Sequence, residues 1–416
     1  MRVTILNRYY PPDLAPTGRL ASDLAEELVR RGHGVSVIAG SDGYAPTQPA
    51  EPEAASQHVD VVRTWTPRLG RRNVLTTLLD FSAYLLGAAY LLFRRSRPDV
   101  VIVLTTPPWL VSLAVLNRML RGSRVILWNM DLYPEVLEAV GAISPDGVIS
   151  RALQWYNRRL FARVDEIVCL DEAMRERLRE RYEGPGNQLP LRVIPNWESA
   201  GRLQSTAGEL DAELKPLFAD PSQFVVLYQG NAGRGHEFES VFEAAGRLTD
   251  KKITFLFVGG GQRRLQLEKA VRQARLDNFH FHDYVSTSCL SALLQSAALA
   301  LITLRESARG VMSPSKLYTY LAAGLPVLYI GPVRTNVDEA IARFGCGRSL
   351  RNGDVAKVAS TLTELHSDPR ECERLQAASR LAYRDGYCDT QILPQLASLV
   401  ESLADTGSHV ENRRAA

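Results

Sequence analysis

Residues 310–324 form the segment best suited to bind a phosphate. Ser313 and Ser315 flank Pro314, a combination typical of a helix start whose first N–H groups point outward. Lys316 falls in the first turn of that helix, where a positive charge is unfavourable against the helix dipole by about 0.3–1 kcal/mol. Its placement makes sense if the lysine meets an anion. The segment therefore predicts a phosphate site built from a helix N-terminus and a lysine.

A glycine-rich turn over residues 229–237 is the second candidate for binding phosphate. It follows the first strand expected in the second half of the chain and precedes a helix. Three glycines accompany Arg234, which suits a diphosphate because glycines allow close approach and a guanidinium pairs with phosphate oxygens. The three glycines at 259–261 would let a flat ligand approach the backbone, although a plain tight turn explains them almost as well.

Two carboxylates, Asp131 and Glu135, come directly after a buried strand. We expect them to project between the two halves of the chain, where they can bind sugar hydroxyls or orient an acceptor. The alternative is that Asp131 caps a helix with Pro134 in its first turn. A further candidate is Thr17-Gly18 at a helix start, where free N–H groups favour an anion. A glycine at a helix start also fits a purely structural role.

The elements that must position these residues alternate between strand and helix. Short apolar runs predict buried strands, and the segments between them predict helices. In the first half the predicted strands are Val3–Leu6, Val35–Ala39, Val100–Leu104, Val125–Trp128 and Glu166–Leu170. In the second half they are Phe224–Tyr228, Ile253–Val258, His280–Phe281, Leu299–Ile302 and Pro326–Ile330. The pattern predicts an α/β protein with two doubly wound parallel sheets, whose ligands bind beyond the carboxyl ends of the strands.

At 416 residues the chain is too long for one ordinary core, so two domains are expected. We place one Rossmann-like domain at residues 1–200 and a second at 201–385. A helix at 386–405 is expected to cross back to the first domain, followed by a tail at 406–416. Two such domains facing an interdomain cleft would provide a usual place for small-molecule chemistry.

The composition excludes several classes of protein. Hydrophobic residues make up 45% and charged residues 23%, as in soluble globular proteins. A net charge of +3 without a long Lys/Arg tract gives no reason to expect nucleic-acid binding. Five scattered cysteines without a CxxC pair indicate reduced cytosolic thiols. A strand-like run begins at Val3, so no signal peptide is expected, and the absence of a DxD pair or His cluster predicts no metal.

The longest apolar stretch, Leu75–Phe93, has about the length of a membrane span. Asp80 lies within it, and a carboxylate there would cost ~3 kcal/mol in a bilayer. We therefore favour a buried or half-buried helix of the first domain. A third interpretation is docking on an anionic leaflet without spanning it, because arginines precede and follow the stretch. These arginines are Arg68, Arg71, Arg72, Arg94, Arg95 and Arg97.

The segment 310–327 resembles the donor site of retaining glycosyltransferases of family 4, which have the GT-B fold. Ser-Pro-Ser-Lys, followed by a helix that ends in Ala-Ala-Gly-Leu-Pro-Val, carries this resemblance. Segments 11–18, 131–135, 193–197 and 228–234 agree with the family in order and spacing, so the match covers nearly the whole chain. The chain is most similar to the branch that builds lipid-linked bacterial surface polysaccharides such as colanic acid and O antigen. Some members of that branch use fucose or N-acetylfucosamine donors.

The resemblance implies a role for each matched residue. The implied catalytic residues are Asp131, Arg234 and Lys316. The implied donor-binding residues are Gly18, Asn231, Gly233, Ser313, Ser315, Tyr284 and Val285, with the last two beside the base. The implied acceptor-binding residues are Thr17, Arg19 and Glu135. The nucleotide sugar, linked to UDP or GDP, is the substrate and no cofactor is implied. The acceptor would be a lipid-linked glycan at the inner face of the cytoplasmic membrane, which makes the enzyme cytoplasmic and peripheral.

Several positions depart from the family pattern. Val311 and Thr319 stand where much of the family has two Glu separated by seven residues. Met130 replaces a frequent His, and the usual Lys after the glycine turn falls near His236. We therefore expect donor choice to lie at Val311 and Thr319. Two alternative functions stay open: a sugar-nucleotide 2-epimerase of related fold, which needs carboxylates and His around the sugar, and a non-catalytic scaffold docked on a membrane.

Overall fold

The computed structural model describes residues 1–13, 15–41, 58–66, 74–199, 201, 208–249 and 252–414. The side chains of residues 74, 75 and 406–414 are not described. The predicted arginines at positions 68, 71 and 72 lie outside the described residues.

The N-terminal domain is built on a seven-stranded parallel sheet in the order β3-β2-β1-β4-β5-β6-β7. Its strands are β1 Arg2–Leu6, β2 Gly34–Gly40, β3 Asp60–Thr64, β4 Val100–Leu104, β5 Arg124–Trp128, β6 Glu166–Cys169 and β7 Leu191–Val193. In β1, Ile5 aligns with Val37 of β2 on one side and Ile102 of β4 on the other. All five residues of β4 are fully buried, as expected for a strand covered on both faces.

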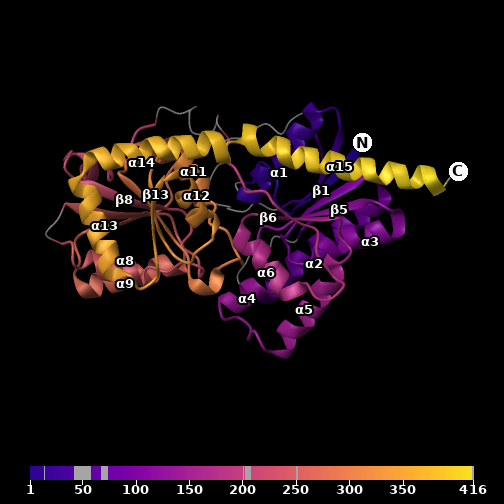
Figure 1. Ribbon diagram of the computed structural model, residues 1–416, viewed down its shortest axis with the longest axis horizontal. Helices are drawn as coiled ribbons and strands as arrows, with labels where there is room; N and C mark the ends of the chain where they lie inside the picture. The colour runs from indigo at the N-terminus through magenta and orange to yellow at the C-terminus, as the bar shows by residue number, and fades with distance from the viewer. Residues whose placement is uncertain are drawn as a thin grey trace.

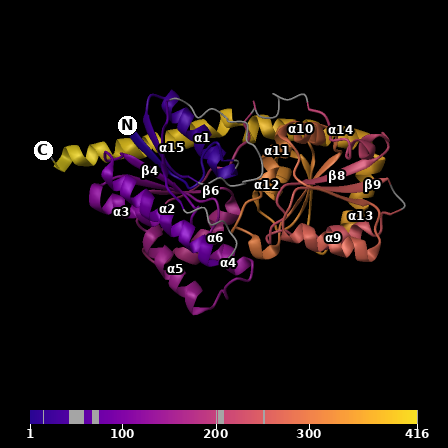
Figure 2. The same cartoon turned by 180° about the vertical axis from the view of Figure 1, so that it is seen from behind.

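Helices cover both faces of this sheet (Figure 1). They are α1 Pro16–Arg30, α2 Val74–Arg94, α3 Val111–Arg121, α4 Glu135–Ala139, α5 Val148–Phe161 and α6 Glu172–Tyr182. Helix α1 and the C-terminal helix α15 pack together on one face, whereas α2, α3 and α5 lie in that order on the other (Figure 2). The first half of the chain therefore has the doubly wound architecture that its alternating pattern predicts.

The C-terminal domain repeats this architecture with a six-stranded parallel sheet in the order β10-β9-β8-β11-β12-β13. Its strands are β8 Phe224–Gln229, β9 Ile253–Val258, β10 Phe279–His282, β11 Leu299–Thr303, β12 Val327–Ile330 and β13 Gly347–Leu350. Its helices are α8 Glu239–Ala245, α9 Gln262–Ala274, α10 Thr287–Ser296, α11 Lys316–Ala322, α12 Asn336–Phe344, α13 Val355–Ser367 and α14 Pro369–Ala382. Short 3₁₀ turns occupy Lys215–Phe218 and Glu306–Ala308, and a π-turn spans Tyr383–Tyr387.

The two domains contact each other through loops at the carboxyl ends of their strands. Asp131, just after β5, forms an isolated antiparallel bridge with Met312, which precedes α11. The backbone N–H of Leu132 donates to the carbonyl of Val311 over 2.9 Å. These contacts bring together the two sheet edges at which ligands of parallel sheets bind.

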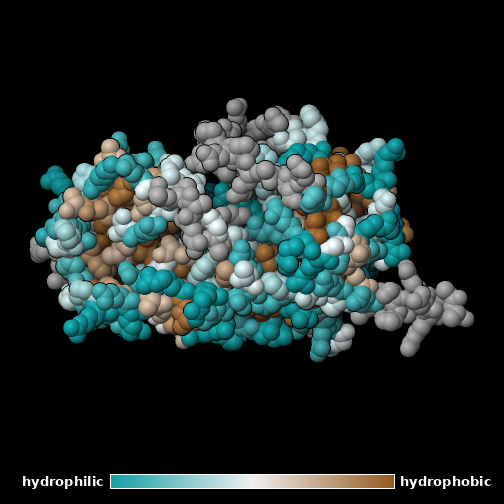
Figure 3. Space-filling view, turned by 90° about the horizontal axis from the view of Figure 1, so that it is seen from above, coloured by the Kyte–Doolittle hydropathy of each residue, from teal (hydrophilic) through white to brown (hydrophobic). Residues whose placement is uncertain are grey.

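The C-terminal helix α15, Asp389–Arg414, leaves the second domain and packs along the first (Figure 1). Its apolar residues Ile392, Leu396 and Val400 belong to the N-terminal core. Because it continues to Arg414, the tail expected at 406–416 is helical over most of its length. Seen from above, the protein surface is mostly hydrophilic, with smaller hydrophobic patches (Figure 3).

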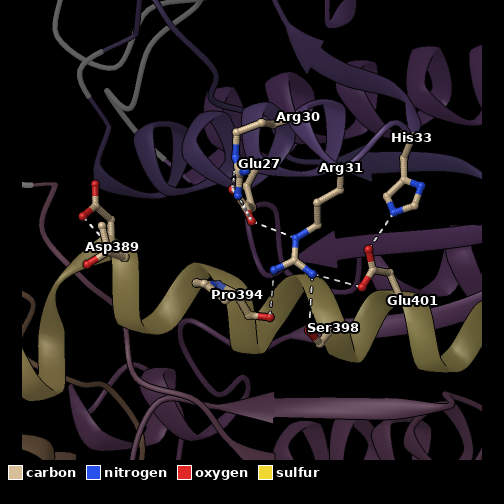
Figure 4. Close-up of polar contacts among 9 residues, drawn as sticks. Glu27, Arg30, Arg31, His33, Asp389, Pro394, Ser398 and Glu401 are labelled. Carbon is tan, nitrogen blue, oxygen red and sulfur yellow. Dashed lines mark hydrogen bonds and ion pairs between the residues drawn. The ribbon is translucent and has the colours of Figure 1, made fainter.

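A cluster of charged residues fixes α15 to α1 (Figure 4). Arg31 donates to Glu27 over 2.7 Å and to Glu401 over 3.0 Å, and its guanidinium also reaches the carbonyl of Pro394. His33 lies 2.9 Å from the second oxygen of Glu401. His33 and Arg31 together hold the pKa of Glu401 below its ordinary value. The helix that ends the chain is therefore joined to the helix that begins it.

Candidate active site between the two domains

The glycine-rich turn after β8 packs against the second run of glycines, residues 259–261. Ala232 donates its N–H to the carbonyl of Gly260 over 2.7 Å. Gly259 and Gly261 have φ values of 121° and 116°, and a Cβ on Gly259 would lie 2.5 Å from the carbonyl oxygen of Gly230. Only glycine fits both requirements. The run 259–261 thus owes its glycines to contact with the neighbouring turn, which agrees with the tight-turn interpretation.

Lys316 lies over this turn from the opposite side. It is the first residue of α11, and its Nζ donates to the carbonyl oxygen of Asn231 over 3.3 Å. The same ammonium lies 4.9 Å from the ring centre of Tyr228, which is buried at the end of β8. Burial lowers the pKa of Lys316 to about 8. Lys316 is therefore a half-buried cation at the start of a helix, where the helix dipole disfavours positive charge, as the sequence predicts.

The other residues of the turn differ in how free they are to meet a ligand. Arg234 is exposed, and its Nε donates to the side-chain oxygen of Gln262 over 2.8 Å. Asn231 is exposed, and Gly233 is half-buried beside its amide. His236 is half-buried, and its Nδ1 lies 2.8 Å from the carbonyl oxygen of Thr303. Burial lowers the pKa of His236 to about 3, so it is neutral at pH 7 and Lys316 and Arg234 supply the positive charge.

Asp131 reaches this region through Met312. The sulfur of Met312 lies so close to Gly235 that a Cβ there would approach it to 2.5 Å. The bridge from Asp131 to Met312 therefore continues directly into the glycine turn. The N–H of Asp131 donates to the hydroxyl of Thr105 over 3.2 Å. Its carboxylate has no hydrogen-bond donor among the described residues, and burial raises its pKa to about 6. An unpaired carboxylate is thus held beside the predicted diphosphate site.

Ser313 and Ser315 do not have the predicted capping role. Ser315 immediately precedes α11, but its backbone is helical and its side chain accepts no cap hydrogen bond. The Ser313 hydroxyl lies beside the carboxylate of Asp171, at the start of α6 in the other domain. Asp171 accepts the N–H of Met174 over 2.8 Å and that of Asn336 in the second domain over 3.3 Å. The prediction that Ser313 caps the helix is wrong because it lies two residues before Ser315, the residue that directly precedes α11. Ser315 stays exposed and available.

Glu135 is turned away from the second domain, contrary to the prediction. It is 1% exposed, accepts the Tyr182 hydroxyl over 2.7 Å and lies 3.3 Å from the Arg181 guanidinium. Burial raises its pKa, while Tyr182 and Arg181 oppose that shift. The prediction that this carboxylate projects between the domains is wrong, since α4 directs it into the N-terminal core.

Glu135→Ala is therefore expected to lower stability and leave acceptor recognition intact. Removing one partner of a buried pair costs about 3–5 kcal/mol, and we expect the lower limit because Arg181 keeps Glu138 as a partner. Urea unfolding followed by circular dichroism measures the change, with exposed Glu180→Ala as the control on α6. An unchanged urea midpoint together with a raised acceptor KM would contradict this assignment.

Gly18, predicted to contact the donor, makes its contacts within the N-terminal domain. Its N–H donates to the carbonyl of Ala15 over 2.9 Å, and a Cβ at Gly18 would lie 3.1 Å from the backbone of Tyr9 and Tyr10. The glycine thus allows the loop after β1 to pack on α1. Thr17 and Arg19, beside it in the first turn of α1, are half-buried.

The segment after β7 connects α1 to α11. Trp197 and Ser199 donate to the carboxylate of Asp23 on α1, over 2.9 and 3.0 Å. Between them, Glu198 accepts the hydroxyl of Thr319 over 2.7 Å. Much of the family has a Glu at the position of Thr319. Here the Glu198 carboxylate, from the segment that connects the two domains, lies beside Thr319 instead. Sequence reasoning missed Glu198 because its partner is 121 residues away.

Two further predicted positions differ in exposure. Val311 is fully buried at the contact with Leu132, so its side chain has no access to a ligand in this arrangement. Tyr284 follows β10, is 52% exposed, and lies so close to Gly260 that a Cβ there would meet its ring at 3.2 Å. Val285 is half-buried against the C-terminal core. Tyr284 is thus a ring at the edge of the glycine turns, where a base could stack.

In the ranges that the structure describes, no group of three His, Cys, Asp or Glu side chains could hold a metal ion. Lys316 and Arg234 are two cations at the glycine turn, and Asp131 is a carboxylate on the loop of the other domain that contacts Met312. These charges suit a diphosphate leaving group and a hydroxylated partner.

Comparison with known proteins gives the same two-part division. Residues 17–197 match the family model described as glycosyl transferase 4-like domain, and residues 211–382 match the model of glycosyl transferases group 1. A protein named for colanic acid biosynthesis, the glycosyl transferase WcaI of Escherichia coli K12, is 26% identical over 83% of this chain and 86% of its own.

Solved structures resemble the whole chain. Sucrose-phosphate synthase of Thermosynechococcus elongatus superposes with a TM-score of 0.75 at 14% identity, covering 98% of this chain and all of that one. HepE of Anabaena, solved with UDP-glucose, gives 0.69 at 13% identity, covering 97% of this chain and all of its own. The two sheets thus form the GT-B fold, and the chain belongs to family 4 of the glycosyltransferases.

Proposed function

We propose that this chain is a retaining glycosyltransferase that moves a sugar from a nucleoside diphosphate to a lipid-linked glycan during assembly of a bacterial surface polysaccharide. The observation that carries the proposal is the half-buried Lys316 beside the glycine turn, four residues after Met312, whose backbone bridges to Asp131 of the other domain. The similarity to WcaI, named for colanic acid biosynthesis, supports the biosynthetic context.

The residues of this site would act mainly through electrostatics. Lys316 and Arg234 would stabilise the charge that develops on the departing diphosphate. Retention would follow if the diphosphate leaves from the face that the acceptor hydroxyl enters, with the diphosphate oxygen taking the hydroxyl proton. Asp131 would orient the acceptor hydroxyl, and Glu198, held at Thr319, would bind a hydroxyl of the donor. No cofactor is required by this scheme.

We propose a UDP- or GDP-linked donor that carries fucose or an N-acetylated deoxyhexosamine. HepE was solved with UDP-glucose, which makes UDP the first base to test. Tyr284 is the residue that we assign to base stacking. The lipid-linked acceptor places the proposed reaction at the cytoplasmic face of the membrane, where the protein would be peripheral.

A thermal-shift screen of UDP- and GDP-sugars tests the donor proposal. A ligand that binds only the folded state stabilises it by about 2.7 kcal/mol at one hundred times its Kd, so a cognate donor is expected to raise Tm by several degrees. Incubation with the stabilising donor alone then separates two reactions. An epimerase converts the donor without acceptor, whereas a transferase leaves the sugar unepimerised. The proposal fails if no nucleotide sugar or free nucleotide raises Tm.

A further inference from the structure

Helix α2 has two faces of opposite character. Asp80, Tyr84, Ala88 and Leu92, four residues apart, are at most 3% exposed and pack on the sheet. On the opposite side Leu78, Leu86 and Tyr90 lie two and one helical repeats of four residues apart and are 55%, 74% and 62% exposed. This helix is long and apolar enough to cross a membrane, yet only 22% of its apolar window is buried in the protein. Its outer face is therefore an apolar stripe without a partner among the described residues.

The neighbouring helices extend this stripe into a broad face. Met119 and Leu120 of α3 are 65% and 68% exposed, and Val148, Ile149 and Trp155 of α5 range from 56% to 74%. Helices α2, α3 and α5 lie side by side on one face of the N-terminal sheet (Figure 2). We call their outer surface the α2–α3–α5 face. An apolar surface of this extent on three adjacent helices is a mark of an interaction site.

The charges on this face have one sign. Helices α2, α3 and α5 contain six arginines and a single acid, Asp80. Asp80 points inward, where its carboxylate lies 3.8 Å from the buried Arg8 guanidinium. Arg118 is paired with Asp165, and the other five arginines of these helices have no carboxylate partner among the described residues. The three helices therefore carry positive charge without an exposed carboxylate of their own. Such a surface complements an anionic partner.

Aromatic rings and arginines are paired on this face. The Arg159 guanidinium lies 4.0 Å from the ring centre of Trp155, and Arg94 lies 5.9 Å from that of Tyr90. Tyrosine and tryptophan beside long cationic side chains are the combination favoured at the boundary between headgroups and acyl chains. Binding to a protein would not require apolar side chains, aromatic rings and arginines to occur together on one face.

We propose that the α2–α3–α5 face docks on an anionic phospholipid leaflet, with its apolar stripe among the acyl chains and its arginines at the headgroups. The inference deepens the proposed function, because a lipid-linked acceptor would be presented at that surface. The inner side of α2 argues against spanning. Tyr84 donates its hydroxyl to the carbonyl of Ile38 over 2.9 Å, and Asp80 is paired with Arg8, so the helix is fixed to the sheet.

Flotation of the purified protein with lipid vesicles tests the proposal. At 0.15 M salt it is expected to bind phosphatidylcholine vesicles that contain phosphatidylglycerol, bind pure phosphatidylcholine weakly, and dissociate progressively at high salt. The double variant Leu86→Ser/Tyr90→Ser should lower the partition coefficient by about tenfold or more, since two exposed apolar groups are lost. Arg151→Glu/Arg159→Glu should lower it by at least tenfold, because each arginine near the surface contributes about fivefold.

Matched variants of the C-terminal domain serve as controls. Leu265→Ser/Leu381→Ser and Arg343→Glu/Arg370→Glu change exposed residues of the same types and should bind vesicles like the wild type. Equal binding to neutral and anionic vesicles, or wild-type binding by the α2 and α5 variants, overturns the proposal. It is also overturned if the face instead forms a dimer, seen as a halved mass for Leu86→Ser/Tyr90→Ser in light scattering. Nucleotide thermal shifts on the same proteins separate this failure from a failure of the proposed donor chemistry.

Discussion

Lys316→Ala is expected to lower kcat/KM for sugar transfer by about 10²–10³, the loss typical of removing one group that stabilises developing negative charge. Lys316 contacts the glycine turn directly: its ammonium donates to the carbonyl of Asn231 and lies 4.9 Å from the ring centre of Tyr228. Because Lys316 is half-buried, its attraction for a diphosphate is screened less by water than that of a fully exposed lysine. Steady-state transfer kinetics and calorimetric titration with the nucleoside diphosphate measure the two parts of the effect.

The pH dependence of nucleotide binding gives a second test of this lysine. Because its pKa is lowered to about 8, the free enzyme loses the charge as pH rises through that value. Donor affinity should therefore fall between pH 7 and 9 in the wild type and show less change in Lys316→Ala. Lys357→Ala, an exposed lysine of the same domain, is the control. Unaltered nucleotide affinity and turnover in Lys316→Ala would exclude its assigned role.

Asp131→Asn is expected to reduce kcat by about 10²-fold, the loss typical when a reacting group is no longer held in position. Burial raises the pKa of Asp131 to about 6, so its carboxylate is ionised above that pH and protonated below it. If the ionised form orients the acceptor, the rate falls as pH decreases through about 6. The variant should lack this acid limb, because asparagine does not titrate.

The exposed Asp146→Asn provides the control for this change. It lies in the same domain, and its substitution should leave both the rate and the acid limb unchanged. Retention of the acid limb in Asp131→Asn would show that another group titrates. Donor binding should persist in Asp131→Asn, which distinguishes loss of acceptor orientation from loss of the nucleotide site.

The strands and the two-domain division could be predicted because buried parallel strands require continuous apolar runs. The run Val100–Leu104 is the clearest, and it coincides with β4. Lys316 could be found because a cation at a helix start is unfavourable without an anion. Helix α2 was predicted to be buried or half-buried, and it is half-buried with Asp80 on its inner side.

The misplaced residues share a physical cause. Ser313 lies near Asp171, and Thr319 donates to Glu198, both from segments more than one hundred residues away. A hydroxyl before a helix has the same local pattern whether it caps that helix or contacts another domain. Glu135 follows a strand end just as Asp131 does, and only the direction of the short α4 turns it towards Tyr182. Local sequence carries no information on these directions.

Helix α15 has a consequence for the order in which the protein can fold during synthesis. Ile392, Leu396 and Val400 complete the core of the domain whose other strands and helices are made first. A ribosome must therefore translate the whole second domain before the first can cover its sheet on that face. Until then, the nascent N-terminal domain exposes an apolar surface that chaperones can bind. A fragment that stops at residue 200 would lack these three residues, so we expect its core to stay incomplete.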